Sequence, residues 1–160
     1  MELTTHVEID APPERVWTVL TDFDRYHEWN PFMRVGGRAN EDARLHVELF
    51  PPGSRATRFR PTVTRAEPNR ELRWLGHLWT TGLFDGEHRF VLDPLDGGTR
   101  TSLTHAESVS GVLTPLAWRL VGDATGRGFE AMNAALKGRV ESMVGDVDEG
   151  VDERRTESTH

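Results

Sequence analysis

Three histidines have the residue type and placement that proton-transfer chemistry would need. His77, His88 and His105 fall in three successive segments that alternate apolar and polar residues, as β-strands do. Histidine can accept and release protons close to neutral pH. His88 and His105 are therefore candidate catalytic residues, as a general acid/base pair on neighbouring strands. The alternative is that each is a hydrogen-bonded histidine in a polar patch of the core, or is exposed to solvent.

The spacing of the residues disfavours metal and nucleotide sites. His77, His88 and His105 could surround a metal ion, but no pair of them has tight ligand spacing. The chain has no cysteines, which excludes disulfides, thiol catalysis and zinc–thiolate sites. Residues 126–131 match the loose G-x-G-x-x-A nucleotide pattern, yet they lie inside a helical run and follow no strand. We expect no metal and no cofactor.

Seven short segments have the pattern of strands. They cover residues 4–9, 32–38, 44–50, 58–66, 71–79, 83–92 and 99–107, with turn residues between them. Pro61 indicates an edge or a bulge in the fourth segment. Short strands at this regular spacing predict an antiparallel meander.

The alternation in the last three strands turns both candidate histidines toward the core. In the sixth strand the more apolar face carries His88, and in the seventh strand His105 shares a face with Glu107. In the fifth strand two alternatives remain open, because either the face with Trp74 or the face with His77 could point inward.

Two short helices follow the first strand, and one long helix ends the domain. Pro12 and Pro13 suit a first helical turn, where a missing N–H costs nothing, and Asn30-Pro31 ends the second short helix. Residues 113–143 have helical periodicity. Their apolar residues form an early stripe and a later stripe, namely Leu116 and Leu120, then Phe129, Met132, Leu136, Val140 and Met143. A curved sheet must cover its apolar face, and this helix is the element large enough to do so.

Small residues interrupt the long helix between its two stripes. Gly122, Gly126 and Gly128 each cost roughly 1 kcal/mol relative to alanine in a helix interior. They could let the helix approach the sheet closely, or they could leave room for a ligand beneath it.

The chain resembles the START-like superfamily, also called SRPBCC, which includes polyketide cyclase/dehydrase-like proteins and lipid-transfer domains. The resembling residues are Ala11-Pro12, Val16-Trp17, Leu20-Thr21-Asp22, Tyr26 through Trp29-Asn30-Pro31, Leu72-Arg73-Trp74, Gly86-Glu87-His88 and Gly98-Thr99-Arg100-Thr101. The resemblance implies an α+β helix-grip fold over residues 1–144. In that fold a curved antiparallel sheet, here of about seven strands, grips the long C-terminal helix and encloses a cavity.

A cavity of this kind implies binding of a small apolar molecule, such as a lipid, a polyketide or an aromatic compound, for carriage or sensing. We expect the ligand-binding residues to be Trp29, Phe32, Leu45, Val47, Phe59, Trp74, His88, Phe90, Leu103, His105, Leu116 and Leu120. Burying apolar ligand surface would supply the affinity, and a few polar groups would orient the ligand.

Two other functions fit the same resemblance. The first is a polyketide cyclase/dehydrase-type enzyme, in which His88 or His105 would move protons on a poly-keto chain. The sole tyrosine, Tyr26, lies in the second short helix, so a tyrosine acid in the sheet is excluded. The second is a protein-interaction module of the chaperone-activator type, which would need an exposed apolar patch rather than a closed cavity. Dimerisation or a captured partner protein would favour it.

Composition sets the expected domain organisation. The chain has 160 residues, enough for one domain with a substantial core, and a net charge of −7. The segment that begins at Gly145 holds six acidic and two basic residues and has no apolar periodicity. We therefore expect residues 145–160 to be a disordered acidic tail.

The charge distribution and the hydropathy pattern also bear on partners and location. A net negative charge disfavours a nucleic-acid partner, because nucleic-acid-binding proteins usually carry a basic face. No apolar run approaches the roughly 20 residues of a membrane span, and the N-terminus lacks the pattern of a signal peptide. We therefore expect a cytoplasmic protein without a transmembrane segment, with a homodimer as one possible assembly.

Overall fold

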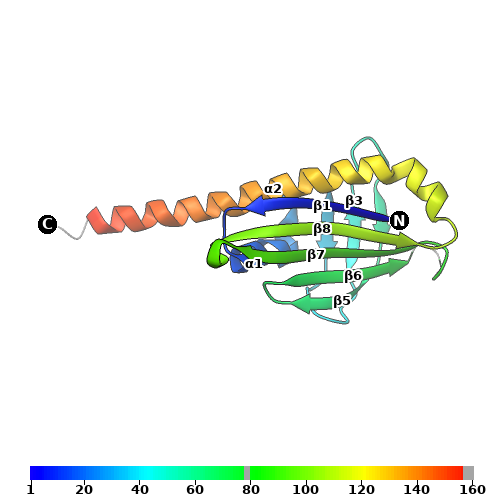
Figure 1. The fold of residues 1–160 in the computed structure, drawn as a ribbon, viewed down its shortest axis with the longest axis horizontal. Helices are drawn as coiled ribbons and strands as arrows, with labels where there is room; N and C mark the ends of the chain where they lie inside the picture. The colour runs from blue at the N-terminus through cyan, green and yellow to red at the C-terminus, as the bar shows by residue number, and fades with distance from the viewer. Residues whose placement is uncertain (78–79, 157–160) are drawn as a thin grey trace.

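The computed structural model describes residues 1–77 and 80–156, with side chains described through Met143. In chain order the elements are β1 (Glu2–Ile9), α1 (Pro13–Thr21), η1 (Phe23–Glu28), β2 (Met33–Gly36), β3 (His46–Leu49), β4 (Thr57–Phe59), β5 (Thr62–Glu67), β6 (Glu71–His77), β7 (Asp85–Leu95), η2 (Asp96–Gly98), β8 (Arg100–Ser110) and α2 (Thr114–Thr156). The strands form an antiparallel five-stranded sheet, in the order β1-β8-β7-β6-β5, and a three-stranded sheet, β2-β3-β4. Helix α2 runs lengthwise beside β1, the edge strand of the five-stranded sheet (Figure 1). The predicted α+β helix-grip architecture is confirmed.

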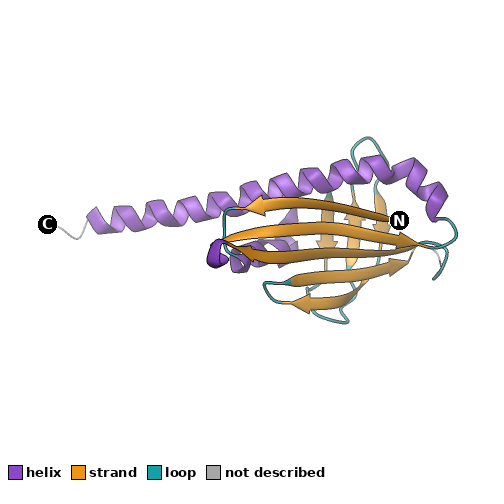
Figure 2. Cartoon of the chain, viewed as in Figure 1, coloured by secondary structure: helices purple, strands orange, loops and turns teal. Residues whose placement is uncertain are grey.

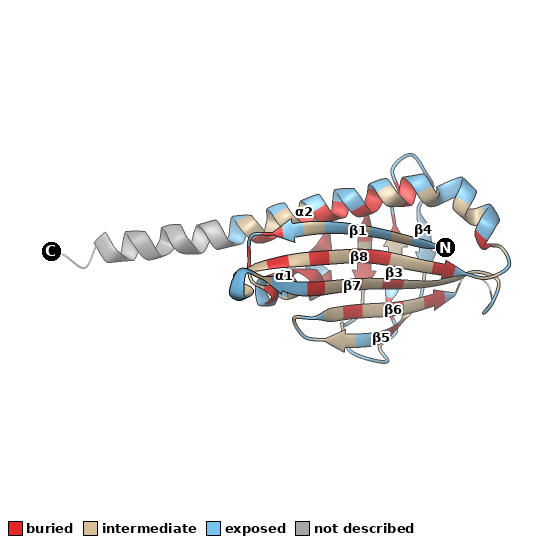
Figure 3. Cartoon of the chain, viewed as in Figure 1, coloured by how far each residue is buried: buried red, intermediate tan, exposed pale blue. Residues whose placement is uncertain are grey.

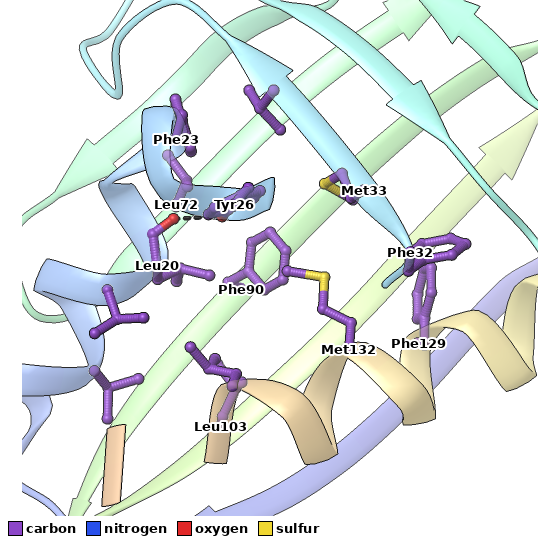
Figure 4. Packing of buried hydrophobic residues seen from close by; sticks show 14 of the residues in the cluster. Leu20, Phe23, Tyr26, Phe32, Met33, Leu72, Phe90, Leu103, Phe129 and Met132 are labelled. Atoms are coloured by element: carbon purple, nitrogen blue, oxygen red, sulfur yellow. Dashed lines mark hydrogen bonds between the residues drawn. The ribbon is translucent and has the colours of Figure 1, made fainter. Parts of the chain in front are cut away.

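Helices α1 and η1 close one end of the sheet (Figure 2). Pro13 occupies the first turn of α1, and Val16 and Leu20 on its inner face are fully buried. The 3₁₀ helix η1 is only six residues long, so tertiary packing must hold it. Tyr26 of η1 supplies part of that packing, because its buried hydroxyl donates a hydrogen bond to the backbone carbonyl of Leu20 (Figure 4).

The described part of the chain has eight strands, because the strand predicted over residues 58–66 divides at Pro61. Proline cannot donate a ladder hydrogen bond, and β4 ends before it while β5 begins after it. The carbonyl of Pro61 instead accepts a 2.9 Å hydrogen bond from the N–H of Leu45. Arg44 and Thr62 form an isolated bridge beside it. These contacts join the two sheets at their shared corner.

Helix α2 buries the later of its two predicted apolar stripes. Phe129, Met132, Leu136 and Val140 are almost completely buried, and Met143 is 39% exposed. Figure 3 shows buried positions along this part of α2, and Figure 4 shows Phe129 and Met132 in the core. The early stripe is largely exposed, since Leu116 and Leu120 are 63% and 75% exposed, although Leu120 also borders the cavity described below. The face that turns toward the sheet there carries Leu113, Ala117 and Val121 instead.

The helix continues beyond the domain boundary predicted at residue 144. Its backbone is helical to Thr156, and residues 157–160 lie outside the described part of the chain. The disorder that we expected for the acidic segment, residues 145–160, stays a prediction. No helix in the described part is long and apolar enough to cross a membrane.

Gly128 brings α2 close to the sheet. A Cβ atom at this position would lie 2.3 Å from two carbons of the Phe32 ring, which is closer than van der Waals contact permits. Phe32 in turn packs edge to face on Phe129, with ring centroids 5.6 Å apart. The glycines of the helix could either let it approach the sheet closely or leave room for a ligand. At Gly128 the first explanation holds, because the Phe32 ring fills the space that a side chain would need.

Candidate functional site

A cavity of about 280 Å³ lies between the sheet and the first turns of α2. Its walls come from four parts of the fold: the β3–β4 region, strands β6 and β7, strand β8, and α2 with the residue just before it. The lining residues are Leu49, Pro51, Ser54, Thr57, Phe59, Trp74, Gly76, His77, Phe84, Gly86, His88, Glu107, Val109, Leu113, Ala117, Trp118, Leu120, Val121 and Thr125. Most of these side chains are apolar, so the cavity suits a largely apolar occupant.

His88 and Glu107 are the polar side chains that face each other in this cavity. They are directly opposite in the antiparallel register of β7 and β8, and both line the wall. Side chains at such opposite positions have Cβ atoms roughly 4.5–5.5 Å apart. A small polar group of a ligand could therefore contact both of them at once.

His88 connects to a hydrogen-bonded chain that runs behind the cavity into α2 and β1. Its Nε2 lies 2.8 Å from Nε2 of His105, and Nδ1 of His105 lies 2.8 Å from Oδ1 of Asn133. The Asn133 amide donates to the hydroxyl of Thr5 over 2.8 Å. Stacking holds both rings, since Trp74 lies nearly parallel to His88 and Phe129 nearly parallel to His105. The structure thus brings the two candidate histidines together.

Both rings are uncharged at neutral pH. Burial lowers the pKa of His105 to about 3, although its hydrogen bond to Asn133 acts in the opposite direction. Burial, and then the nearby His105, lower the pKa of His88 well below its ordinary value. Of these two histidines His88 lines the cavity and His105 does not, so His105 has no direct access to a ligand there.

Glu107 is a cavity residue whose charge changes near neutral pH. Burial raises its pKa to about 7, so that neutral and ionised forms coexist at that pH. His77 also lines the cavity, but its Nδ1 is held 2.7 Å from Asp85. In the described part of the chain no three histidine or acidic side chains gather as a metal site.

The predicted ligand-binding residues separate into those on the cavity wall and those elsewhere. Phe59, Trp74, His88 and Leu120 line the cavity. The fully or almost fully buried core contains Phe32, Leu45, Val47, Phe90, Leu103 and His105. Trp29 packs against that core, and Leu116 is exposed. A ligand-binding role for these eight residues stays a prediction.

Several lining residues were not among the predicted binding residues. Leu113, Ala117, Val121 and Thr125 recur every four residues along the inner face of α2, and this spacing was the signal for them. Glu107 was expected on the face of His105, but its position opposite His88 depends on the strand register. For β6, the buried face is the one with Trp74.

A second hollow, of about 600 Å³, lies on the other side of Phe59, between η1 and the three-stranded sheet. Its wall includes Arg34, Arg58 and Glu48, and Arg58 is paired with Glu48 at 2.9 Å. Val47 borders this hollow and not the cavity beneath α2.

Solved structures share this fold. A START superfamily protein from Mycobacterium smegmatis is 24% identical, with 89% of this chain and 98% of that chain covered and a TM-score of 0.68. A protein from Thermus thermophilus is 19% identical, with coverage of 89% and 99% and a TM-score of 0.69. The Zhui aromatase/cyclase from a Streptomyces species is 17% identical, with coverage of 90% and 95% and a TM-score of 0.71.

A match at the level of the family accompanies these similarities in fold. No curated protein matches the chain. The model of the family described as "Polyketide cyclase / dehydrase and lipid transport" matches residues 1–141, which is most of the chain. The chain therefore belongs to the polyketide cyclase / dehydrase and lipid transport family.

Proposed function

We propose that this protein binds a small, largely apolar molecule in the cavity beneath α2, for carriage or sensing. The observation that carries the proposal is the cavity itself, with its apolar wall and its two facing polar side chains, His88 and Glu107. Ligand sites are typically concave, mostly apolar and furnished with a few polar groups that orient the ligand.

The size of the cavity restricts the ligand. About 280 Å³ is just below the roughly 300–1,000 Å³ common for ligand pockets. A compact aromatic or short-chain molecule fits this space better than a lipid with two long acyl chains. Burial of its apolar surface contributes about 25 cal/mol per Å² before the costs of association.

Native mass spectrometry of freshly purified protein, before and after organic extraction, tests the proposal. A discrete additional mass that extraction removes is the expected result and identifies the ligand. Tryptophan fluorescence gives a second measurement, because Trp74 and Trp118 both line the cavity. If no compound co-purifies and no small aromatic probe alters the tryptophan emission at millimolar concentration, the proposal is wrong.

Catalysis of the cyclase/dehydrase type is a second candidate, and the pairing of His88 with Glu107 favours it. A neutral imidazole could remove a proton next to a ketone, and a protonated carboxyl could donate one to the departing oxygen. The similarity in fold to an aromatase/cyclase is compatible with this reaction. The test is incubation with poly-keto substrates. Loss of product formation in both His88→Gln and Glu107→Gln, with ligand affinity retained, is expected for an enzyme.

A further inference from the structure

The hydrogen-bonded chain behind the cavity determines which ring nitrogens carry protons. The hydroxyl of Thr5 lies 3.0 Å from the backbone carbonyl of His105, and a carbonyl can only accept, so the hydroxyl donates there. The same hydroxyl must then accept from Asn133, whose Nδ2 lies 2.8 Å away. This contact orients the amide and directs Oδ1 of Asn133 toward His105.

The orientation of Asn133 fixes both imidazole rings in turn. Nδ1 of His105 donates to Oδ1 of Asn133, so Nε2 of this neutral ring has no proton. Nε2 of His88, 2.8 Å away, must therefore be the donor to it. Since His88 is also neutral, its remaining nitrogen, Nδ1, is an acceptor.

Nδ1 of His88 is available to a ligand. None of the described residues hydrogen-bonds to it. Among the described residues, the fully enclosed polar side-chain atoms without a partner are Asn30 Nδ2, Trp74 Nε1 and Thr114 Oγ1. His88 Nδ1 is not one of them, so this atom is not fully enclosed. His88 lines the cavity with Glu107 opposite it. An acceptor at this point favours a group that can donate a proton.

We infer that the cavity selects an apolar ligand with an uncharged hydroxyl, which donates to His88 Nδ1 beside Glu107, and that it discriminates against carboxylates. The inference rests on the proposed function and specifies the ligand's polar group. A ligand carboxylate has no proton to donate to Nδ1, so the lone pairs of the two groups would repel. Its negative charge would also be repelled by ionised Glu107. Asn133 and Thr5 contact no ligand in this arrangement and act as positioning residues.

The first experiment compares naphthalene, 2-naphthol and 2-naphthoate by tryptophan quenching at pH 8. We expect 2-naphthol to bind at least about tenfold more tightly than 2-naphthoate, because a buried polar group that faces a mismatched partner loses its hydrogen bonds to water without replacement. Equal affinity of both probes, with naphthalene also bound, overturns the selectivity and leaves the proposed function standing. Failure of all three probes to bind overturns both.

The second experiment reads the protonation of the rings by nitrogen-15 NMR and needs no ligand. In the wild-type protein we expect the His88 proton on Nε2, and a proton on Nδ1 overturns the inference. Asn133→Leu removes the acceptor for His105 Nδ1, so nothing then fixes the His105 proton on Nδ1 or the His88 proton on Nε2.

In that variant we expect the population of His88 with its proton on Nδ1 to rise, and the preference for 2-naphthol over 2-naphthoate to fall. Thr5→Ser keeps the hydroxyl and should retain both the wild-type tautomer and the wild-type preference. An Asn133→Leu protein that is folded by circular dichroism but keeps the His88 proton entirely on Nε2, or keeps the wild-type preference, contradicts the inference.

Discussion

The imidazole ring of His105 on β8 stacks face to face on the phenyl ring of Phe129 on α2, with centroids 3.9 Å apart and planes 8° apart. Phe129 also meets the ring of His88 at 5.1 Å and that of Phe32 at 5.6 Å. One helix residue therefore holds both histidines in place and anchors α2 to the sheet.

Truncation of Phe129 should be strongly destabilising. Phe129→Ala removes a fully buried ring and is expected to lower the free energy of unfolding by about 3–5 kcal/mol. The matched control is Phe50→Ala, because Phe50 is 38% exposed and should cost less than about 1 kcal/mol. Urea denaturation of both variants measures the difference, and similar losses would contradict the anchoring role.

Alanine at two glycines of α2 should have opposite effects. Gly128→Ala places a Cβ 2.3 Å from the Phe32 ring and should cost about 1–3 kcal/mol. Gly138→Ala meets nothing within 4 Å and should stabilise the protein by about 0.5–1 kcal/mol through helix propensity. Thermal unfolding distinguishes them, and a neutral Gly128→Ala would show that the helix can move away without loss.

Glu107 should make stability decrease with rising pH. Its folded-state pKa of about 7 lies above the ordinary carboxyl value, so the folded protein binds more protons than the unfolded chain between about pH 4.5 and 7. Glu107→Gln removes the free-energy cost of ionising this buried carboxyl in the folded protein. Relative to wild type, the variant should gain about 1–3 kcal/mol on going from pH 4 to pH 8, measured by urea unfolding.

Glu2→Gln provides a control of opposite sign. The hydrogen bond from Thr4 and the charge of Arg89 lower the pKa of Glu2, so its contribution to stability is present at pH 8 and lost in acid. That variant should lose stability relative to wild type at pH 8 but not at pH 2. If Glu107→Gln behaves in the same way, Glu107 is not held in a desolvated environment.

Filling the cavity should reduce binding without unfolding the protein. Ala117→Phe extends a ring from α2 into the cavity and should weaken 2-naphthol binding at least about tenfold, with little change in melting temperature. Ala134→Phe makes the same change on the exposed side of α2 and should leave binding unchanged. Equal binding by wild type and both variants would place the probe somewhere other than this cavity.

Much of the fold could be predicted from residue patterns. Two-residue alternation placed His88 and His105 on inward faces, and helical spacing placed Phe129 and Met132 on the buried face of α2. Pro61 indicated the irregularity at which one predicted strand divides into two. These features depend on local periodicity and backbone chemistry, which the order of residues determines directly.

Other features of the site depend on contacts between segments distant in the chain. The register of β7 and β8 sets Glu107 opposite His88, and alternation alone could assign only the face. Leu116 and Leu120 have helical spacing, but the side of α2 that turns toward the sheet in these turns carries Leu113, Ala117 and Val121, so the stripe of Leu116 and Leu120 is largely exposed. The chain from Thr5 through Asn133 to His88 joins β1, α2, β8 and β7. Only tertiary packing decides these relationships, because the distances that make a cavity or a hydrogen bond are set between elements and not within them.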